Sequence, residues 1–560
     1  MLLFYGCSDK QISDDSFSSA KYLRVLDLRD CQLQKLPDSI FQLKQLRYLN
    51  LSGSTRLVNL PDSFGNLINL GHIDLSSCSG LLKLPDSFAN LTSVMHINLS
   101  GCVGLKSLTE SFGNLTNVVH VNLSGCVGLK SLPESLGLLE KLEYLDLSSC
   151  SCLEGISSVV DGLTNLQHLN LSHPCCYVAQ HRFHLRALKD VWVKLTNLRY
   201  LNLSMCLNPI FCYLPEERIE YIESISCLHT LEHLDLSYNI FLFDIHRSLG
   251  QLSQLQTLNL FGCARLKRIE KWMGEKKLLG VSNCLGLETY QFVVRTDGGT
   301  KSSNLAQLKD VSCKELEINC LEKVISMEEV QSIGLAEKKK LQKLTLVWST
   351  APDDASFDDH QALLAVLVPP QNLQCFELHG YSSEYLPAWL TSRLLSSYLP
   401  NLVEVSLVDI PSCRNLPPFG VLPNLQRLIL RRVAKVTRID AGCLSGGSKA
   451  AFHRLLHVTL DDMVNLEEFS NCSSSDELVM FPTLDELVIN KCPKLRFGGS
   501  PPKARMLVIS DCDHLMSSPV KRGEHDAVED PSISTSTAIT RGPVTEVVIE
   551  SCKVPLDELK

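Results

Sequence analysis

A repeat of about 24 residues runs through the first half of the chain and limits its possible folds. Each copy follows the frame L-x-x-L-x-L-x-x-C-x-L, as in the run from Leu23 to Leu33. The second strand leucine of the frame recurs at gaps of 23 or 24 residues, at Leu28, Leu51, Leu75, Leu99, Leu123, Leu147 and Leu171. One copy cannot bury its own apolar edge, so successive copies must stack. The sequence therefore predicts a solenoid.

This frame is the leucine-rich repeat signature, with cysteine in the asparagine position. It predicts an α/β fold: a curved horseshoe with a parallel β-sheet on the concave face and short helices, 3-10 turns and loops on the convex face. We expect a regular block at 1–290 and a linker or bend with a charged helical stretch at 291–340. An irregular block with a disordered loop at 520–543 is expected at 341–560. Solenoids mostly bind other molecules, so recognition is expected.

Composition and the chain termini exclude several classes of function and location. The formal net charge of -9 argues against nucleic-acid binding through phosphate contacts. No stretch approaches the ~20 apolar residues of a membrane helix, and the N-terminus lacks the basic region of a secretory signal. We therefore expect a cytoplasmic protein without a membrane segment. The chain begins inside a repeat and stops right after a strand, which predicts a fragment or a truncated product.

The cysteines follow the repeat. Of 23 cysteines, twelve fall three residues after the last apolar strand position, where the chain turns and a small thiol can be buried. Neighbouring thiols would lie one strand spacing apart, ~4.8 Å, but a reducing cytosol disfavours disulfides. Pairs at zinc-finger spacing are absent, so no metal is expected. The twelve are Cys7, Cys31, Cys78, Cys102, Cys126, Cys150, Cys206, Cys263, Cys284, Cys492, Cys512 and Cys552.

Motifs for catalysis are missing. The chain has no G-x-x-x-x-G-K-[ST] phosphate loop, no H-E-x-x-H zinc motif and no G-x-S-x-G nucleophile turn. Serine, histidine and aspartate are scattered over repeat positions. We therefore expect no enzymatic activity and no cofactor.

Period-2 alternation places the x residues of the frame on the concave face. The position between the two strand leucines is always Asp or Asn, a uniformity that indicates an architectural role. The residue before each strand centre forms a Tyr/His stripe suited to protein contacts. The preceding residue varies most, so partners would be discriminated there. The predicted protein-binding residues are Arg24, Arg47, Tyr48, His72, Met95, His96, His120, Glu143, Tyr144, His168, Arg199, Tyr200, Glu232 and His233.

Two other clusters have both a functional and a structural interpretation. His72, His96 and His120 on adjacent strands could share a metal or sense pH, but duplication of the repeat alone explains three stacked histidines. The second cluster is basic and is followed by an acidic stretch, which we interpret first as solvated faces of neighbouring repeats and second as a polar docking patch. These residues are Arg427, Arg431, Arg432, Lys435 and Arg438, then Asp461, Asp462, Glu467 and Glu468.

Several motifs resemble the leucine-rich repeat region of plant coiled-coil nucleotide-binding disease resistance proteins, particularly the grass type. Residues 318–324 with 338–348 resemble the marker between that family's two repeat blocks. The other matching motifs are residues 22–28, 36–40, 43–49, 416–425, 481–484 and 492–495. The resemblance covers nearly the whole chain, but the coiled coil and the nucleotide-binding switch of the family are missing from it.

The resemblance implies a protein-recognition and regulatory module of plant innate immunity. Its expected partners are a pathogen effector or a modified host protein, which it senses, and the nucleotide-binding module of an immune receptor, which it holds inactive. The alternative is a free-standing intracellular scaffold or adaptor, such as a substrate-binding arm of a ubiquitin ligase, although neither end shows an F-box-like segment. A secreted receptor ectodomain comes third, because the signal peptide is missing and cysteine occupies the turn position.

Overall fold

A computed structural model gives the fold of most of the chain. It describes residues 2–3, 12–172, 188, 190–207, 222–276, 278–296, 302–349, 360–440, 452–470, 472–473, 476–479, 481–497, 504–512 and 546–550. The predicted disordered loop at 520–543 lies outside the described residues. The chain divides into two compact units, Met1–Arg268 with Trp272–Leu287, and Ile269–Lys271 with Glu288–Lys560.

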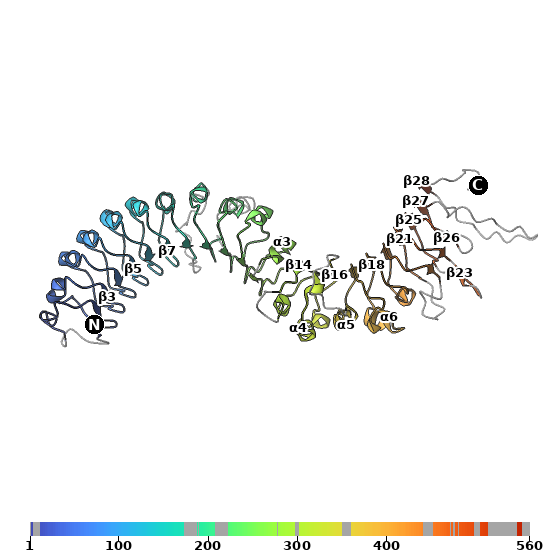
Figure 1. The fold of residues 1–560 in the computed structure, drawn as a ribbon, viewed down its shortest axis with the longest axis horizontal. Coiled ribbons are helices and arrows are strands. Elements are labelled where there is room, and N and C mark those ends of the chain that lie inside the picture. The colour runs from blue at the N-terminus through green and yellow to red at the C-terminus, as the bar shows by residue number, and fades with distance from the viewer. Residues whose placement is uncertain are drawn as a thin grey trace, which may run out of the picture. The chain divides into compact units, whose positions relative to one another are not determined.

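The first unit is built on a twelve-stranded parallel sheet whose strands follow chain order. The strands line the inner side of an arc and the helices lie on its outer side (Figure 1). The strands are β1 (Leu2–Leu3), β2 (Val25–Asp27), β3 (Tyr48–Asn50), β4 (His72–Asp74), β5 (His96–Asn98), β6 (His120–Asn122), β7 (Tyr144–Asp146), β8 (His168–Asn170), β9 (Tyr200–Asn202), β10 (His233–Asp235), β11 (Thr257–Asn259) and β13 (Leu278–Gly280). The predicted leucine-rich repeat solenoid is confirmed.

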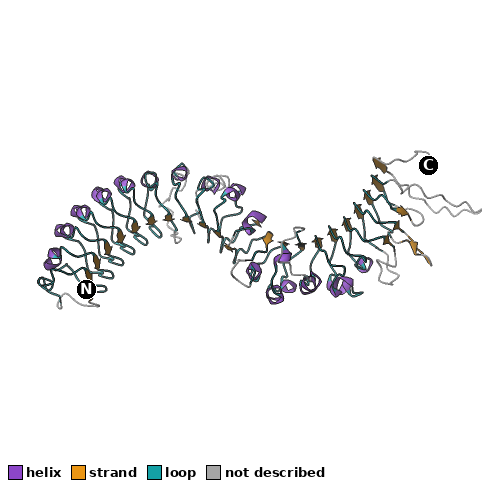
Figure 2. Cartoon of the chain, viewed as in Figure 1, coloured by secondary structure: helices purple, strands orange, loops and turns teal. Residues whose placement is uncertain are grey.

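Short helices lie on the outer side of most repeats (Figure 2). Proline precedes several of them as an extended N-cap and an acidic residue opens the turn, as with Pro85 and Asp86. The carboxylate meets the positive end of the helix. The helices are η1 (Asp38–Gln42), η2 (Asp62–Asn66), η3 (Asp86–Asn90), η4 (Glu110–Asn114), η5 (Glu134–Leu138), α1 (Ser157–Val160), η7 (Trp192–Lys194), η8 (Arg247–Gln251) and α3 (Lys271–Gly274).

A stack of phenylalanines fills the core behind these helices. The rings of Phe64, Phe88 and Phe112 lie almost parallel, with centroids 5.7 and 6.2 Å apart, and each is at most 1% exposed. The phenylalanine of each repeat therefore packs against the equivalent phenylalanine of the next repeat. This contact between neighbours joins the repeats into one core.

The turn cysteines form a second buried row. The Sγ atoms of Cys78, Cys102 and Cys126 donate to backbone carbonyls one repeat earlier at 3.1–3.2 Å. Burial raises the pKa of Cys78 and of Cys126 to about 12, so these thiols stay protonated and can donate. The predicted structural role of the turn cysteines is thus confirmed for these repeats.

The second unit carries an eleven-stranded parallel sheet. Its order is β12 (Arg268–Ile269), β14 (Thr289–Val293), β15 (Glu315–Asn319), β16 (Lys343–Val347), β17 (Cys375–His379), β18 (Glu404–Val408), β19 (Arg427–Arg431), β21 (His457–Asp461), β25 (Glu486–Asn490), β27 (Met506–Ser510) and β28 (Glu546–Glu550). Smaller sheets are formed by β20 (Arg438–Ile439), β22 (Glu468–Phe469) and β26 (Arg496–Phe497), and by β23 (Cys472–Ser473) and β24 (Asp476–Val479).

Helices between these strands are η9 (Asn304–Leu308), η10 (Leu321–Lys323), α4 (Met327–Ser332), η11 (Leu335–Glu337), α5 (His360–Val366), α6 (Ala388–Thr391), α7 (Leu395–Tyr398) and η12 (Phe419–Val421). The segment 291–340, predicted as a linker or bend, contains β15, which pairs in register with β14 and β16. This segment is therefore part of the second sheet. The periodicity fades there because strand starts lie 26, 28 and 32 residues apart, at residues 289, 315, 343 and 375.

Candidate functional site

Eight of the predicted binding residues form one continuous row of rings on the inner sheet of the first unit. Each is the first residue of a strand from β3 to β10, and parallel pairing sets it beside the same position of the next strand. We call this row the ring ladder: Tyr48, His72, His96, His120, Tyr144, His168, Tyr200 and His233. The centroids of successive rings are 4.8, 5.6, 5.7, 3.9, 4.2, 4.1 and 6.3 Å apart.

Stacking determines which parts of the rings in the ring ladder remain accessible to a binding partner. His120, Tyr144 and His168 stack with interplanar angles of 12° and 17°, so their faces are covered by one another. The ring edges, which carry imidazole nitrogens and phenol oxygens, remain for contact. Such edges make hydrogen bonds to polar groups. The ring ladder is therefore suited to recognising a protein surface with polar groups.

Burial changes the acidity of the ring ladder. Desolvation lowers the pKa of His72 and of His120, with a further contribution from the neighbouring His96, and lowers the pKa of His168 to about 4. It also raises the pKa of Tyr144 to about 12. These three histidines are therefore neutral at pH 7, where the imidazole both donates and accepts hydrogen bonds.

A pH-dependent stability follows for His168. Its folded-state pKa lies below the unfolded value, so the unfolded chain binds more protons and the folded state loses stability as pH falls from about 6.5 to about 4. His168→Phe keeps a stacked ring and removes this titration. We expect the melting temperature of the wild type to fall more than that of the variant between pH 7 and pH 4, measured by circular dichroism. Equal decreases in the two proteins would contradict the burial of this imidazole.

The Asp/Asn column beside the ring ladder is architectural, as predicted. Oδ1 of Asn50 accepts a hydrogen bond from the N–H of Ser52 at 2.8 Å, and Oδ1 of Asp146 accepts one from the N–H of Ser148 at 2.8 Å. The bond to the residue two positions later turns the backbone out of the strand, because Asp and Asn side chains mimic a backbone turn. This column therefore shapes the repeat.

The variable column runs along the edge where the chain enters each strand. The side chains of Arg24, Arg47, Met95, Glu143 and Arg199 are exposed there, and Glu232 is half-buried. Arg24 stands apart from the ring ladder, because the strand that follows it begins with Val25. A cavity of about 370 Å³ opens on this edge. Its lining residues are Val119, Glu140, Lys141, Glu143, Asn165, Gln167, Asn197 and Arg199.

Only Glu143 and Arg199 of the eight lining residues are among the predicted binding residues, and Val119 and Gln167 share their column. Glu140, Lys141, Asn165 and Asn197 belong to the turns between helix and strand, outside the frame of the repeat. The asparagines follow a recurring Thr-Asn-Leu pattern, and Nδ2 of Asn165 donates to the carbonyl of Glu140 at 2.8 Å. That pattern could have identified them as a structural ladder, although not as the lining of a cavity.

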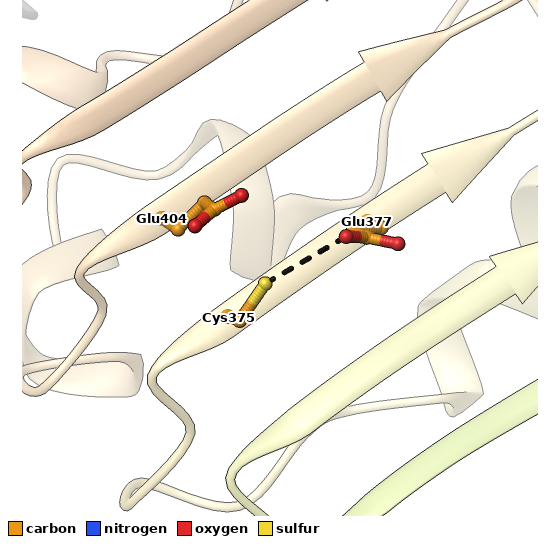
Figure 3. Close-up of side chains that lie close together, drawn as sticks. All are labelled: Cys375, Glu377 and Glu404. Carbon is orange, nitrogen blue, oxygen red and sulfur yellow. Dashed lines mark hydrogen bonds between the residues drawn. The ribbon is translucent and has the colours of Figure 1, made fainter. Parts of the chain in front are cut away.

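The second unit holds the closest group of potential metal ligands in the described part of the chain: Cys375, Glu377 and Glu404, whose ligand atoms lie within 4.8 Å of one another (Figure 3). The two carboxylates already have cationic partners. Nζ of Lys343 lies 2.8 Å from Oε1 of Glu377, and Nη1 of Arg427 lies 3.2 Å from Oε2 of Glu404. The carboxylates of this group are thus neutralised by the protein's own cations.

The basic and acidic clusters of the second unit also pair with each other. Nε of Arg431 lies 2.7 Å from Asp461, and Nε of Arg438 lies 3.1 Å from Glu468. Arg432 pairs with Asp409. These contacts favour the interpretation as faces of neighbouring repeats over a docking patch.

Comparisons with known proteins agree with the fold. Residues 303–433 match a family model described as R13L1/DRL21 leucine-rich repeats, and residues 2–125 match one described as a leucine-rich repeat region. Disease resistance protein RGA2 of Solanum bulbocastanum is 27% identical over 216 residues, which cover 38% of this chain and 21% of that protein. A relative from Arabidopsis thaliana is 28% identical over 229 residues, covering 38% of this chain and 16% of that protein. The chain thus spans about a fifth of the length of these relatives.

Among solved structures, a leucine-rich repeat protein of Leptospira interrogans is 22% identical with a TM-score of 0.36, covering 74% of this chain and 91% of that chain. In the described residues, no helix is long and apolar enough to cross a membrane. The fold defines a leucine-rich repeat protein. Over about two fifths of its length the chain is similar to plant disease resistance proteins, which confirms the resemblance predicted from the motifs.

Proposed function

We propose that the chain is the recognition and regulatory repeat region of a plant immune receptor, and that the inner sheet of its first unit binds a protein. The partner would be a pathogen effector or a modified host protein in the cytoplasm. The observation that carries this proposal is the ring ladder beside the variable column. It combines a rigid row of polar ring edges with exposed side chains that differ from repeat to repeat.

Each column would have its own role in recognition. The ring ladder would supply contacts that tolerate many partners, because tyrosine and histidine offer apolar bodies and polar edges at low entropic cost. The variable column would select among partners, because its members differ in charge and size, from Met95 to Glu143 to Arg199. Neither role needs a cofactor or a catalytic group.

The regulatory part of the proposal concerns a nucleotide-binding module elsewhere in the receptor. The relatives are disease resistance proteins about five times as long as the matched region, so the repeats would act with other modules. Holding such a module inactive requires an interface that competes with partner binding. The energy of partner binding would then shift the receptor toward its active state.

A fusion tests this function. The chain is fused downstream of the nucleotide-binding module of a disease resistance protein of the resembled family, in place of that protein's own repeats, and cell death in leaves is measured after expression. We expect the fusion to cause no cell death when it is expressed alone. We expect it to cause cell death with at least one effector in a panel, and we expect the module without the repeats to cause none with that effector. A fusion that behaves like the isolated module with every effector would contradict the proposal and favour the free-standing scaffold.

A further inference from the structure

An exposed group of large apolar side chains follows strands β10 and β11 of the first unit. Tyr238, Ile240 and Phe243 lie in the turn after β10 and are 44%, 40% and 39% exposed. Phe261 lies in the turn after β11, and its ring meets that of Tyr238 edge to face, with centroids 5.2 Å apart. Large apolar side chains that are exposed together, rather than singly, mark interaction sites. We define the aromatic patch as Tyr238, Ile240, Phe241, Phe243, Phe261 and Arg265.

The sequence of the patch departs from that of the nearly identical repeats. The run Ser-Gly-Cys-Val-Gly-Leu-Lys occurs at 100–106 and again at 124–130. The corresponding residues at 237–243 are Ser-Tyr-Asn-Ile-Phe-Leu-Phe. Aromatic residues therefore stand where the other copies have two glycines and a lysine. The fold of the repeat does not require them, because those copies form the same turn without them.

Tyr238 also has a backbone conformation that a tyrosine rarely adopts. Its φ is 57°, and Gly101, Gly125 and Gly262 have the same left-handed conformation at the same position of their repeats. Glycine adopts this conformation freely, whereas a large side chain is strained in it. Strain of this kind is concentrated at functional sites. A tyrosine that is strained and still leaves its ring exposed indicates a binding role.

The guanidinium of Arg265 is positioned by two rings of the aromatic patch. Its Cζ atom lies 4.7 Å from the ring centroid of Phe241 and 5.7 Å from that of Phe243. The rings contact the flat side of the guanidinium, which leaves N–H groups at its edge for an acceptor. In the described part of the chain, Arg265 pairs with no carboxylate, and Asp244 pairs instead with Arg268 at 2.7 Å. The aromatic patch thus combines exposed rings with a positioned cation.

This combination indicates the chemistry of a partner. A guanidinium binds a carboxylate through parallel hydrogen bonds, and the adjoining rings can cover an aliphatic or aromatic side chain. RNA and anionic membranes carry many negative charges and are bound by many cations. The formal net charge of -9 does not favour such a polyanion. A peptide segment with one carboxylate beside an apolar side chain fits the aromatic patch best.

We propose that the aromatic patch docks a segment of a protein partner in which an apolar side chain adjoins an aspartate or a glutamate. The apolar side chain packs on the rings of Tyr238 and Phe261, and the carboxylate binds Arg265. This inference goes beyond the proposed function, because it concerns a second surface. The aromatic patch follows the strands, whereas the variable column precedes them, so the two surfaces lie at opposite edges of the sheet and can be tested separately.

Peptide selection tests the aromatic patch. A random peptide library displayed on phage is panned on the full chain and on a patch variant with Tyr238→Gly and Arg265→Gln. The control variant, with Tyr22→Gly and Arg56→Gln, removes the same groups from exposed positions outside the patch. We expect peptides with an acidic residue next to an apolar one to be enriched on the wild type and on the control, and not on the patch variant.

Direct binding then separates the two contacts. A selected peptide is compared with a version in which the neutral amide residue, glutamine or asparagine, replaces its acidic residue. Charge-assisted hydrogen bonds predict roughly tenfold or greater weakening for the neutral peptide on the wild type, and no difference between the two peptides on Arg265→Gln. Tyr238→Gly should weaken the binding of both peptides. Its melting temperature should stay close to that of the wild type, because glycine relieves the strain at this φ.

Several results would overturn the inference. One is a wild-type selection without acidic residues, and another is equal enrichment on the patch variant. Vesicles of phosphatidylcholine with phosphatidylserine, and polyuridylic acid, are tested on the same three proteins. Binding of either that is lost only in the patch variant would assign the aromatic patch to a polyanion and would also overturn the inference.

Discussion

Replacing Phe88 with alanine is expected to destabilise the first unit by about 3–5 kcal/mol, the usual cost of a large aromatic truncated in a core. The ring is 1% exposed and stacks between Phe64 and Phe112. Collapse around the void is restricted because the ring sits on η3, whose entry is fixed by Pro85. The loss of stability should extend to both neighbouring repeats, because each repeat is stabilised mainly by its contacts with the next.

Hydrogen exchange under increasing urea measures this effect locally. Amides from η2 to η4 should lose protection together in Phe88→Ala. Ile68→Ala is the matched control, because its side chain is 50% exposed and its truncation should cost well under about 1 kcal/mol. A loss of protection confined to η3, or no larger than that of the control, would contradict the continuous stack.

Asn239→Ala is the second large effect, expected to cost about 1–3 kcal/mol, the usual cost of leaving a buried polar group unpaired. Asn239 is fully buried and occupies the turn position that most repeats give to cysteine. Its Oδ1 accepts from the N–H of Leu207 at 2.6 Å, and its Nδ2 donates to the carbonyls of Leu203 and Leu236 at 3.1 and 2.7 Å. The carbonyls keep other donors, Cys206 N–H and Cys263 Sγ, but the Leu207 N–H is left buried and unpaired.

The informative comparison is Asn239→Cys, which installs the residue typical of the repeat. A thiol is a weak acceptor, so Leu207 remains poorly satisfied and the variant should lose most of the stability that Asn239→Ala loses. Urea unfolding of both variants provides the measurement. Wild-type stability in Asn239→Cys would show that the amide contributes no more than a thiol at this turn.

The frame of the repeat predicted the parts of the structure that depend on period alone. Residues such as His96 and His120 occupy identical positions in near-identical copies, so parallel pairing in register stacks them. The same logic placed the buried thiol of Cys102. It could not place Glu404 beside Cys375, because the two lie 29 residues apart (404 minus 375) on strands joined by helices α6 and α7.

The sequence could not reveal the cavity for a related reason. Glu140 and Lys141 lie in a turn where other repeats carry different residues. Whether they line a cavity depends on how this turn packs against Asn165 and Asn197. Their partners, such as Asn117 for Lys141, are set by geometry between repeats. The position of a residue in the frame predicts the face that it occupies, but its ion-pair partner depends on how neighbouring repeats pack.

The proposed recognition by the inner sheet of the first unit is tested most directly by comparing two variant sets in the fusion assay. The inner set changes Arg47, Met95, His96 and Arg199 to alanine, and the outer set changes Ile68, Glu110, Glu134 and Leu138, which are also exposed. The measurement is cell death triggered by an effector to which the wild-type fusion responds. We predict that the inner set abolishes this response and that the outer set retains it. A response retained by the inner set and lost in the outer set would contradict the account.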